Sequence, residues 1–184
     1  MSNEADRVAG ELLACWFDPQ NHPLWFKSTP AFDALLRDDF GAAVERAARG
    51  ELDELEASAD GALALCLLLD QIPRNIWRGT AAAFAQDEQA RAVADRAITR
   101  GFDLAVRHEG RVFLYLPFEH SEHLADQDRA VKLIGPLGPE QLDYAVRHRD
   151  IVARFGRFPH RNRALGRTST AEEEAFLQEP GSSF

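Results

Sequence analysis

The sequence predicts an all-α protein, and three observations support this fold class. Apolar residues recur three or four positions apart along most of the chain, alanine is frequent, and no run alternates β-branched and polar residues as a strand would. Hydrophobic residues make up 45% of the 184 residues and charged residues 28%, which is typical of a folded globular protein. Because this length can bury a sizeable core, we expect a single helical domain over residues 1–184.

The first two helices are predicted on either side of a loop that contains two prolines. Val8, Leu12 and Trp16 are spaced to share one face of the first helix, and residues 18–27 form the loop. Thr29 has the pattern of an N-cap followed by proline, and Gly50 ends the helix that begins there. The expected apolar face of this second helix is formed by Phe32, Leu35, Leu36, Phe40 and Val44.

The longest apolar run predicts a buried core helix over residues 59–69, which Pro73 must end or kink. This run is too short to cross a bilayer. Thr80 and Asp87 are the expected caps of a further helical stretch that reaches Arg100 and stops at Gly101.

Residues 112–116 are apolar and aromatic, which fits a strand or a short helix. We expect a short helix, because the neighbouring segments are helical and Pro117 follows at once. Ser121 is the expected cap of the next helix, which reaches about Ile134.

The glycines and prolines of residues 135–139 mark the clearest break in the chain. Pro139 begins another expected helix, which runs to about Phe155. Thr170 and Glu173 form a capping-box pattern for a last helix that ends near Gln178. No segment repeats at a fixed period and no tetratricopeptide consensus is visible, but antiparallel helical hairpins are the natural packing for helices with such short connections.

Charge and cysteine content restrict the partners and the compartment. The formal net charge of −9 argues against nucleic acid and against an anionic membrane as partners. Cys15 and Cys66 give neither a disulfide framework nor a metal-ligand spacing, and the N-terminus lacks a signal-peptide pattern. We therefore expect a cytoplasmic protein without a cofactor or a bound metal, and the sequence specifies no oligomeric state.

Three segments, at residues 69–79, 116–123 and 148–162, place charged side chains beside proline and aromatic residues. The stretch from residue 147 to residue 167 carries seven arginines, one acid and no lysine. Arginine favours planar, bidentate contacts to carboxylates and phosphates. Either these arginines pair with the protein's own carboxylates in a network that only fixes the fold, or they line a site for an anionic ligand.

For the ligand hypothesis we expect a small-molecule site that binds an anion, with or without catalysis. Glu119 or His120 is the candidate acid or base, and Asp70 is expected to orient an arginine or the histidine. The candidate ligand-binding residues are Asp70, Arg74, Arg78, Arg154, Arg157, His160 and Arg161.

Two further alternatives stay open. A binding module for a protein or peptide would leave the charged cluster purely structural and expose Trp25, Trp77 or phenylalanine rings along a groove. A carboxylate–histidine metal site would use the residues packed between positions 119 and 123, but acids there also suit a helix N-terminus.

The three charged segments resemble the bacterial domain-of-unknown-function 924 family. The resemblance rests on Leu69-Asp70-Gln71-x-Pro73-Arg74-Asn75-x-x-Arg78-Gly79, on Phe113-Leu114-Tyr115-Leu116-Pro117-x-Glu119-His120-Ser121-Glu122, and on residues 154–162. It extends to Trp25-Phe26, Phe32-Asp33 and the closing residues 180–184. His123 is a departure, since an acidic or polar residue is expected there, and this weakens a metal site that rests on it. The resemblance implies an all-α, tetratricopeptide-like fold and supplies neither an activity nor catalytic residues.

Overall fold

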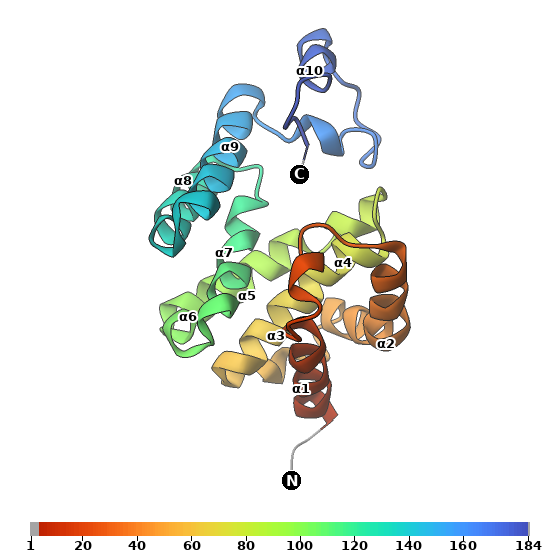
Figure 1. The fold of residues 1–184 in the computed structure, drawn as a ribbon, viewed down its shortest axis with the longest axis vertical. Helices are drawn as coiled ribbons and strands as arrows, with labels where there is room; N and C mark the ends of the chain where they lie inside the picture. Colours follow the sequence, from red (N-terminus) through yellow and green to blue (C-terminus); the bar gives the residue numbers. More distant parts are fainter. Residues whose placement is uncertain (1–3, 184) are drawn as a thin grey trace. The chain divides into compact units, whose positions relative to one another are not determined.

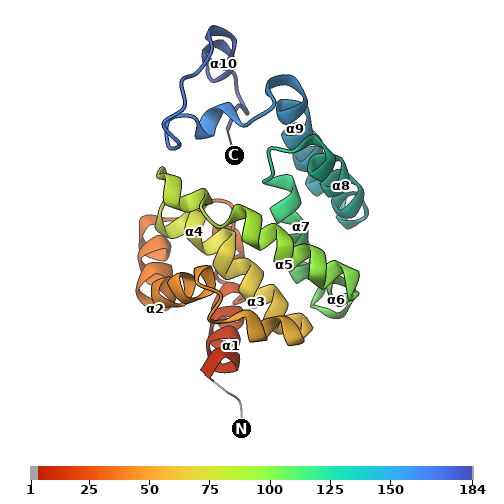
Figure 2. The same cartoon turned by 180° about the vertical axis from the view of Figure 1, so that it is seen from behind.

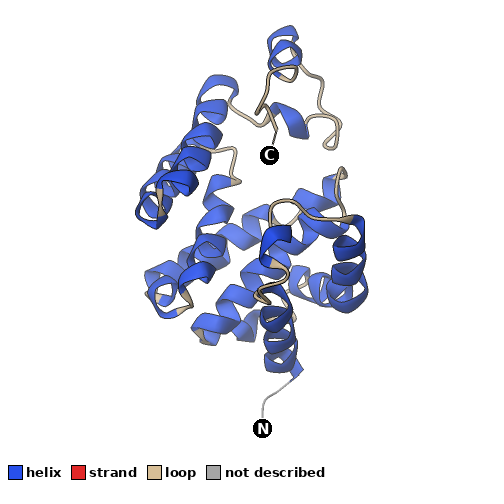
Figure 3. Ribbon diagram, viewed as in Figure 1, coloured by secondary structure: helices blue, strands red, loops and turns tan. Residues whose placement is uncertain are grey.

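The computed structural model describes residues 4–183, and it confirms the all-α fold class (Figures 1 and 3). The chain is 72% helical, and the described part contains no strand. The helices are α1 (Glu4–Trp16), α2 (Pro30–Ala48), α3 (Ala59–Leu69), α4 (Gln71–Ile76), α5 (Asp87–Thr99), α6 (Phe102–Ala105), α7 (Arg111–Glu119), α8 (Leu124–Ile134), α9 (Pro139–Phe155) and α10 (Ala171–Phe176).

The chain divides into two compact units. Unit 1 contains residues 4–78 and 82–117, and unit 2 contains residues 79–81 and 118–183. The expectation of one domain over the whole chain, and that of a tetratricopeptide-like arrangement, both stay predictions.

Unit 1 is built around α3, which α1, α2 and α5 contact (Figures 1 and 2). Every residue from Gly61 to Leu69 is buried, as the uninterrupted apolar run predicts for a core helix. Ser58 caps this helix by accepting a hydrogen bond from the Gly61 backbone N–H at 3.1 Å. The break falls at Asp70, and Pro73 then lies in the first turn of α4, where its missing N–H leaves no helical bond unmade.

The predicted signals at the ends of α2 are confirmed, and one predicted core residue is wrong. Thr29 Oγ1 accepts from the Phe32 backbone N–H at 3.2 Å, Pro30 is the first helical residue, and Gly50 follows the helix with φ of +74°. Leu35 is 42% exposed, because it lies at the edge of the buried face, roughly 60° round the helix from Phe32 and 100° from Leu36.

Three predicted helix boundaries differ from the structure. Residue 87 is the first residue of α5 rather than its cap, and Thr80 precedes a separate short 3-10 helix at Ala81–Phe84. Helix α7 continues through Pro117 to Glu119. Helix α8 begins at Leu124 instead of after Ser121, because the Ser121 hydroxyl accepts from His123 N–H and donates to Asp126, which shapes the turn before the helix.

Unit 2 is centred on the antiparallel pair α8 and α9, which lie side by side in both views (Figures 1 and 2). Ile151 and Val152 of α9 form a small apolar core with Phe158, against which Phe155 and Phe176 pack. Helix α10 begins with the predicted capping box: Thr170 Oγ1 accepts from Glu173 N–H at 3.2 Å and Glu173 accepts from Thr170 N–H at 2.7 Å. Within residues 4–183, no helix is both long enough and apolar enough to span a membrane.

Candidate functional site

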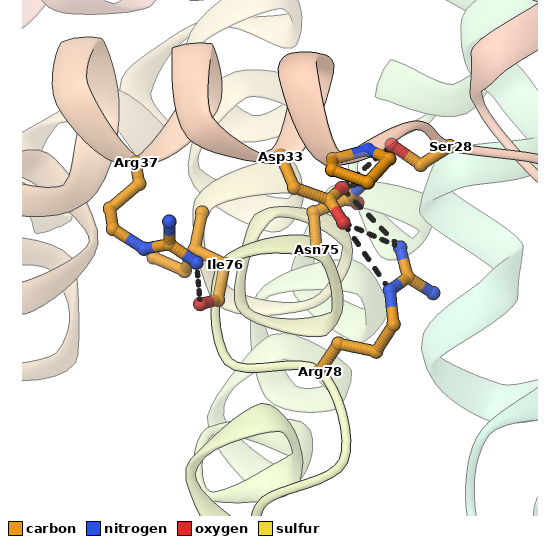
Figure 4. A pocket seen from close by; sticks show the side chains of 7 residues that line it. Ser28, Asp33, Arg37, Asn75, Ile76 and Arg78 are labelled. Carbon is orange, nitrogen blue, oxygen red and sulfur yellow. Dashed lines mark hydrogen bonds and ion pairs between the residues drawn. The ribbon is translucent and has the colours of Figure 1, made fainter.

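A polar hollow of about 480 Å³ lies between α2 and the end of α4 in unit 1 (Figure 4). We call it the α2–α4 hollow. Its lining residues come from the segment before α2, the N-terminal part of α2, the end of α4 and the residues just after α4. They are Ser28, Pro30, Asp33, Arg37, Asn75, Ile76 and Arg78.

The carboxylate of Asp33 is held by donors from three segments (Figure 4). Asp33 Oδ1 accepts hydrogen bonds from Ser28 Oγ at 2.6 Å and from Asn75 Nδ2 at 2.8 Å. Arg78 Nη2 lies 3.2 Å from Asp33 Oδ2. Burial alone would raise the pKa of Asp33, but the hydrogen bonds from Ser28 and Asn75 and the charge of Arg78 lower it. Asp33 is therefore an ionised anchor that fixes one wall of the hollow.

The guanidinium group of Arg37 reaches across from α2 to the C-terminus of α4 (Figure 4). Arg37 Nη2 donates to the Ile76 carbonyl oxygen at 2.7 Å, which satisfies a carbonyl at the end of that helix. Arg37 makes no ion pair with any residue in the described chain, although Asp33 lies one helical turn before it. The donors of Asp33 explain this, since they already occupy its carboxylate.

Asp70 and Arg74 form a second charged group in unit 1. Arg74 Nη1 lies 3.1 Å from Asp70 Oδ1 and donates to the Asp70 carbonyl oxygen, and Arg74 Nη2 lies 2.9 Å from Asp87 Oδ1. Asp70 is only 1% exposed, and Gln71 also donates to its side chain. Arg74 is thus paired with two carboxylates of its own unit.

Glu119 is paired with His148 inside unit 2. Glu119 Oε1 lies 3.3 Å from His148 Nδ1, which also contacts the Tyr144 carbonyl oxygen at 2.8 Å, and both side chains are buried. Because both neighbours of Nδ1 are acceptors, the imidazole carries its hydrogen there and Nε2 has the lone pair.

The electrostatics around His148 keep the imidazole neutral. Burial lowers its pKa to about 3, and the nearby His120, Arg161 and His160 act in the same direction, while the bond to Tyr144 opposes them. The predicted residues His120, His160 and Arg161 lie nearby: the His120 ring centre is 6.4 Å from that of His148, and His160 and Arg161 both pack on Phe158, whose ring contacts His148 edge-on. With such a low pKa, His148 is a weak base at neutral pH. The acid–base role of Glu119 or His120 stays a prediction.

Most arginines of residues 147–167 bind protein carboxylates. Arg157 holds Glu173 through Nε at 2.6 Å and Nη2 at 2.8 Å, and its Nη2 also donates to the Thr168 carbonyl. Arg154 pairs with Glu172 at 2.9 Å on the surface. Arg167 binds both oxygens of Glu122 at 2.7 and 2.9 Å. These contacts are those that the structural-network hypothesis expects.

The second and third charged segments meet within unit 2 through Glu119 with His148, and Glu122 of the second segment also binds Arg167, which follows the third. Phe158 N–H also donates to Glu122 at 2.8 Å. The first segment belongs to unit 1, so a common site for all three stays a prediction. Among the described residues, no group of three or more histidine, cysteine, aspartate or glutamate side chains is arranged to hold a metal ion.

Sequence reasoning did not select the residues that line the α2–α4 hollow, apart from Arg78. Asp33 and Asn75 belong to the sequence motifs that resemble the family, and this resemblance was the signal that could have pointed to them. Nothing in the sequence around Arg37 indicates that its guanidinium group caps a helix 39 positions away. His148 belongs to the third charged segment but is not among the candidate site residues that the sequence predicts.

The fold and these contacts define an all-α protein whose conspicuous charged side chains are largely paired with one another. A family model described as "Bacterial protein of unknown function (DUF924)" matches residues 12–181, and the chain belongs to this family. A comparison with curated proteins finds no match. The chain is 47% identical to a structure of a protein of unknown function from Agrobacterium tumefaciens, with a TM-score of 0.91 and coverage of 95% of this chain and 99% of that one.

Proposed function

We propose that the protein binds a small anionic molecule in the α2–α4 hollow, with Arg37 as the principal cation. The observation that supports this most directly is the charge that remains at the hollow after internal pairing. Arg37 and Arg78 contribute two positive charges and Asp33 one negative charge, which leaves one guanidinium group without a carboxylate in its unit.

The size and the rigidity of the hollow also suit a small ligand. A volume of about 480 Å³ falls within the range of small-molecule sites. The hydrogen bonds to Asp33 and to the Ile76 carbonyl hold both guanidinium groups in place before a ligand arrives, so that less ordering entropy opposes binding. Arg37 keeps N–H donors besides the one bonded to Ile76, and these suit a carboxylate or phosphate oxygen.

The ligand class that follows is a small carboxylate or phosphate. Arg78 is 61% exposed at its side chain, so the hollow can admit a molecule from solvent. Asn75 lies between the two arginines in Figure 4 and supplies an amide to the lining. The proposal assigns binding and no reaction.

A protein- or peptide-binding module is the other hypothesis, and it has less support from the aromatic residues. It requires exposed Trp25, Trp77 or phenylalanine rings along a groove. Trp25 packs against Trp16 and Phe113 and donates from its indole N–H to the Trp16 carbonyl at 2.7 Å. Trp77 is half-buried, while Phe26 is 68% exposed. An exposed single ring is ordinary on a protein surface and defines no groove.

A thermal-shift titration with inorganic phosphate, succinate and acetate tests the proposal. Wild-type protein should be stabilised by phosphate or succinate as the concentration rises, reaching about 2.7 kcal/mol at a hundredfold excess over Kd. The Arg37→Gln variant should lose most of this stabilisation. Glutamine is too short to replace Arg37 Nη2 at the Ile76 carbonyl, but this carbonyl borders the hollow, where water can donate instead, so the unliganded variant should stay folded.

Arg7→Gln is the matched control, because it removes the same charge from an exposed site on α1 where Arg7 pairs with Glu11. It should respond to the anions as the wild type does. Equal stabilisation of the wild type and Arg37→Gln would show a general salt effect and would refute the proposed site.

A further inference from the structure

Helix α7 contains a proline in its interior, and this proline removes one of the hydrogen bonds of the helix. Pro117 lies inside α7, which continues to Glu119. In an α-helix the backbone N–H of residue 117 would donate to the carbonyl oxygen of residue 113, four positions earlier. Proline has no N–H, and its ring crowds that carbonyl group, so the Phe113 carbonyl oxygen lacks its usual donor.

This carbonyl group belongs to the core of unit 1, away from bulk solvent. Phe113 and Leu114 are both fully buried. Trp16 and Trp25 pack edge-to-face against the Phe113 ring, with ring centres 5.6 and 5.0 Å away, and hold the residue in place. A buried carbonyl oxygen without a donor lowers stability, so a donor from another element is expected here.

The donor comes from the core helix α3. Cys66 Sγ donates to the Phe113 carbonyl oxygen at 3.3 Å, although the two residues are 47 positions apart. Cys66 is fully buried, and this burial, together with the negative charge of Asp70, raises the pKa of its thiol, so that the sulfur keeps its hydrogen. A thiol is ordinarily a weak donor, and its use at this position is explained by the acceptor that Pro117 leaves open.

We propose that the Cys66 thiol replaces the backbone donor that Pro117 lacks, and that it thereby holds α7 in helical form up to Glu119. The residue before a proline is biased away from the helical conformation, so a helix that continues through a proline needs such support. Cys66 is then a conformational element of unit 1. It does not line the α2–α4 hollow, and neither do Phe113 and Pro117, so the test is independent of the proposed function.

A double-mutant cycle in urea unfolding tests the proposal through the residue that creates the need for the thiol. In the Pro117→Ala variant the new backbone N–H can donate to the Phe113 carbonyl oxygen, so the thiol is no longer required. Cys66→Ala should therefore raise the unfolding equilibrium constant at least about fivefold more in the wild type than in Pro117→Ala. The packing lost with the sulfur atom is the same in both backgrounds, so it cancels from the comparison.

Cys15→Ala is the matched control, because it makes the same substitution at the half-buried cysteine of α1. It should have equal effects in the two backgrounds. Infrared spectroscopy of the Cys15→Ser variant, in which Cys66 is the remaining cysteine, gives a measurement that does not depend on unfolding. Its S–H stretching band should lie at a lower frequency than that of a thiol without a hydrogen bond, because donation to a carbonyl oxygen weakens the S–H bond.

The proposal is overturned if Cys66→Ala has the same effect on unfolding with and without Pro117, since the thiol then only fills space. It is also overturned if the S–H band of Cys66 has the frequency of a thiol that makes no hydrogen bond.

Discussion

Glu173 provides the sharpest test of the charged network in unit 2. Its carboxylate is almost fully buried and accepts hydrogen bonds from Arg157 Nε at 2.6 Å, Arg157 Nη2 at 2.8 Å and the Thr170 backbone N–H at 2.7 Å. The hydrogen bonds from Arg157 lower the pKa of Glu173 from 4.5 to about 2. Burial acts in the opposite direction, and the hydrogen bond from the Thr170 backbone lowers the pKa further. Arg157, which the sequence predicted as a ligand-binding residue, is therefore paired with Glu173 of the next helix, α10.

The Glu173→Gln substitution should destabilise the protein by about 2–3 kcal/mol, because it replaces charge-assisted hydrogen bonds and turns a donor toward Arg157 or Thr170. For a chain of this size that corresponds to a fall in Tm of roughly 4–12 °C. Differential scanning calorimetry at neutral pH measures the change.

The pH dependence of the same variant gives a second measurement. A carboxylate whose pKa is lower in the folded state stabilises the protein above pH 4.5, and this stabilisation is lost as the pH falls toward 2. Glu173→Gln should therefore show a shallower loss of stability over this range than the wild type.

Glu172→Gln is the neighbouring control, since its side chain is 64% exposed and its pair with Arg154 lies on the surface. It should change stability by less than about 1 kcal/mol. If Glu173→Gln and Glu172→Gln have equal effects, the reasoning about the buried pair is wrong.

Three further predictions concern other parts of the molecule. The imidazole of His148 should stay neutral, with its hydrogen on Nδ1, from pH 8 down to pH 5, because its pKa is about 3. A ¹⁵N NMR titration measures this, and a pKa near the ordinary histidine value of 6.5 would contradict it. Gly10→Ala should raise the free energy of unfolding by roughly 0.5–1 kcal/mol, because the added Cβ meets no neighbour within 4 Å. Gly110→Ala should lower it by about 1–3 kcal/mol, because its Cβ would lie 2.8 Å from Leu63 Cδ2. Urea unfolding measures both changes. Arg74→Ala should cost about 3–5 kcal/mol in the same assay by removing a cation from the buried Asp70, and a change below about 1 kcal/mol would show that the pair is not needed.

Local signals in the sequence were sufficient for the longer helices but only partly for their ends, and the short helices α4 and α6 were not predicted. The apolar run of α3, the Thr29 cap and the Thr170–Glu173 capping box each depend on residues that are close together in the sequence, and each is confirmed. The start of α8 was misplaced because Ser121 uses its hydroxyl for His123 and Asp126. A serine before a helix has the same sequence pattern in either arrangement.

The partners of charged side chains could not be predicted in the same way. Asp33 and Arg37 have the spacing of a helical ion pair, yet Asp33 is bound by Asn75 and Arg78, and Arg37 caps α4. These bonds join residues about 40 positions apart, and their formation depends on how α2 packs against α4. The number of arginines in residues 147–167 likewise did not show that Glu172 and Glu173 would neutralise part of their positive charge.

The most direct test of the central claim is a ¹H–¹⁵N NMR titration of the protein with inorganic phosphate and with succinate. Binding in the α2–α4 hollow predicts that the largest shift changes map to Ser28, Asp33, Arg37 and residues 75–78, including the side-chain N–H signals of Arg37 and Arg78. The Arg37→Gln variant should abolish these changes. Shift changes that are absent, or that are confined to residues 147–167, would contradict an anion site between α2 and α4.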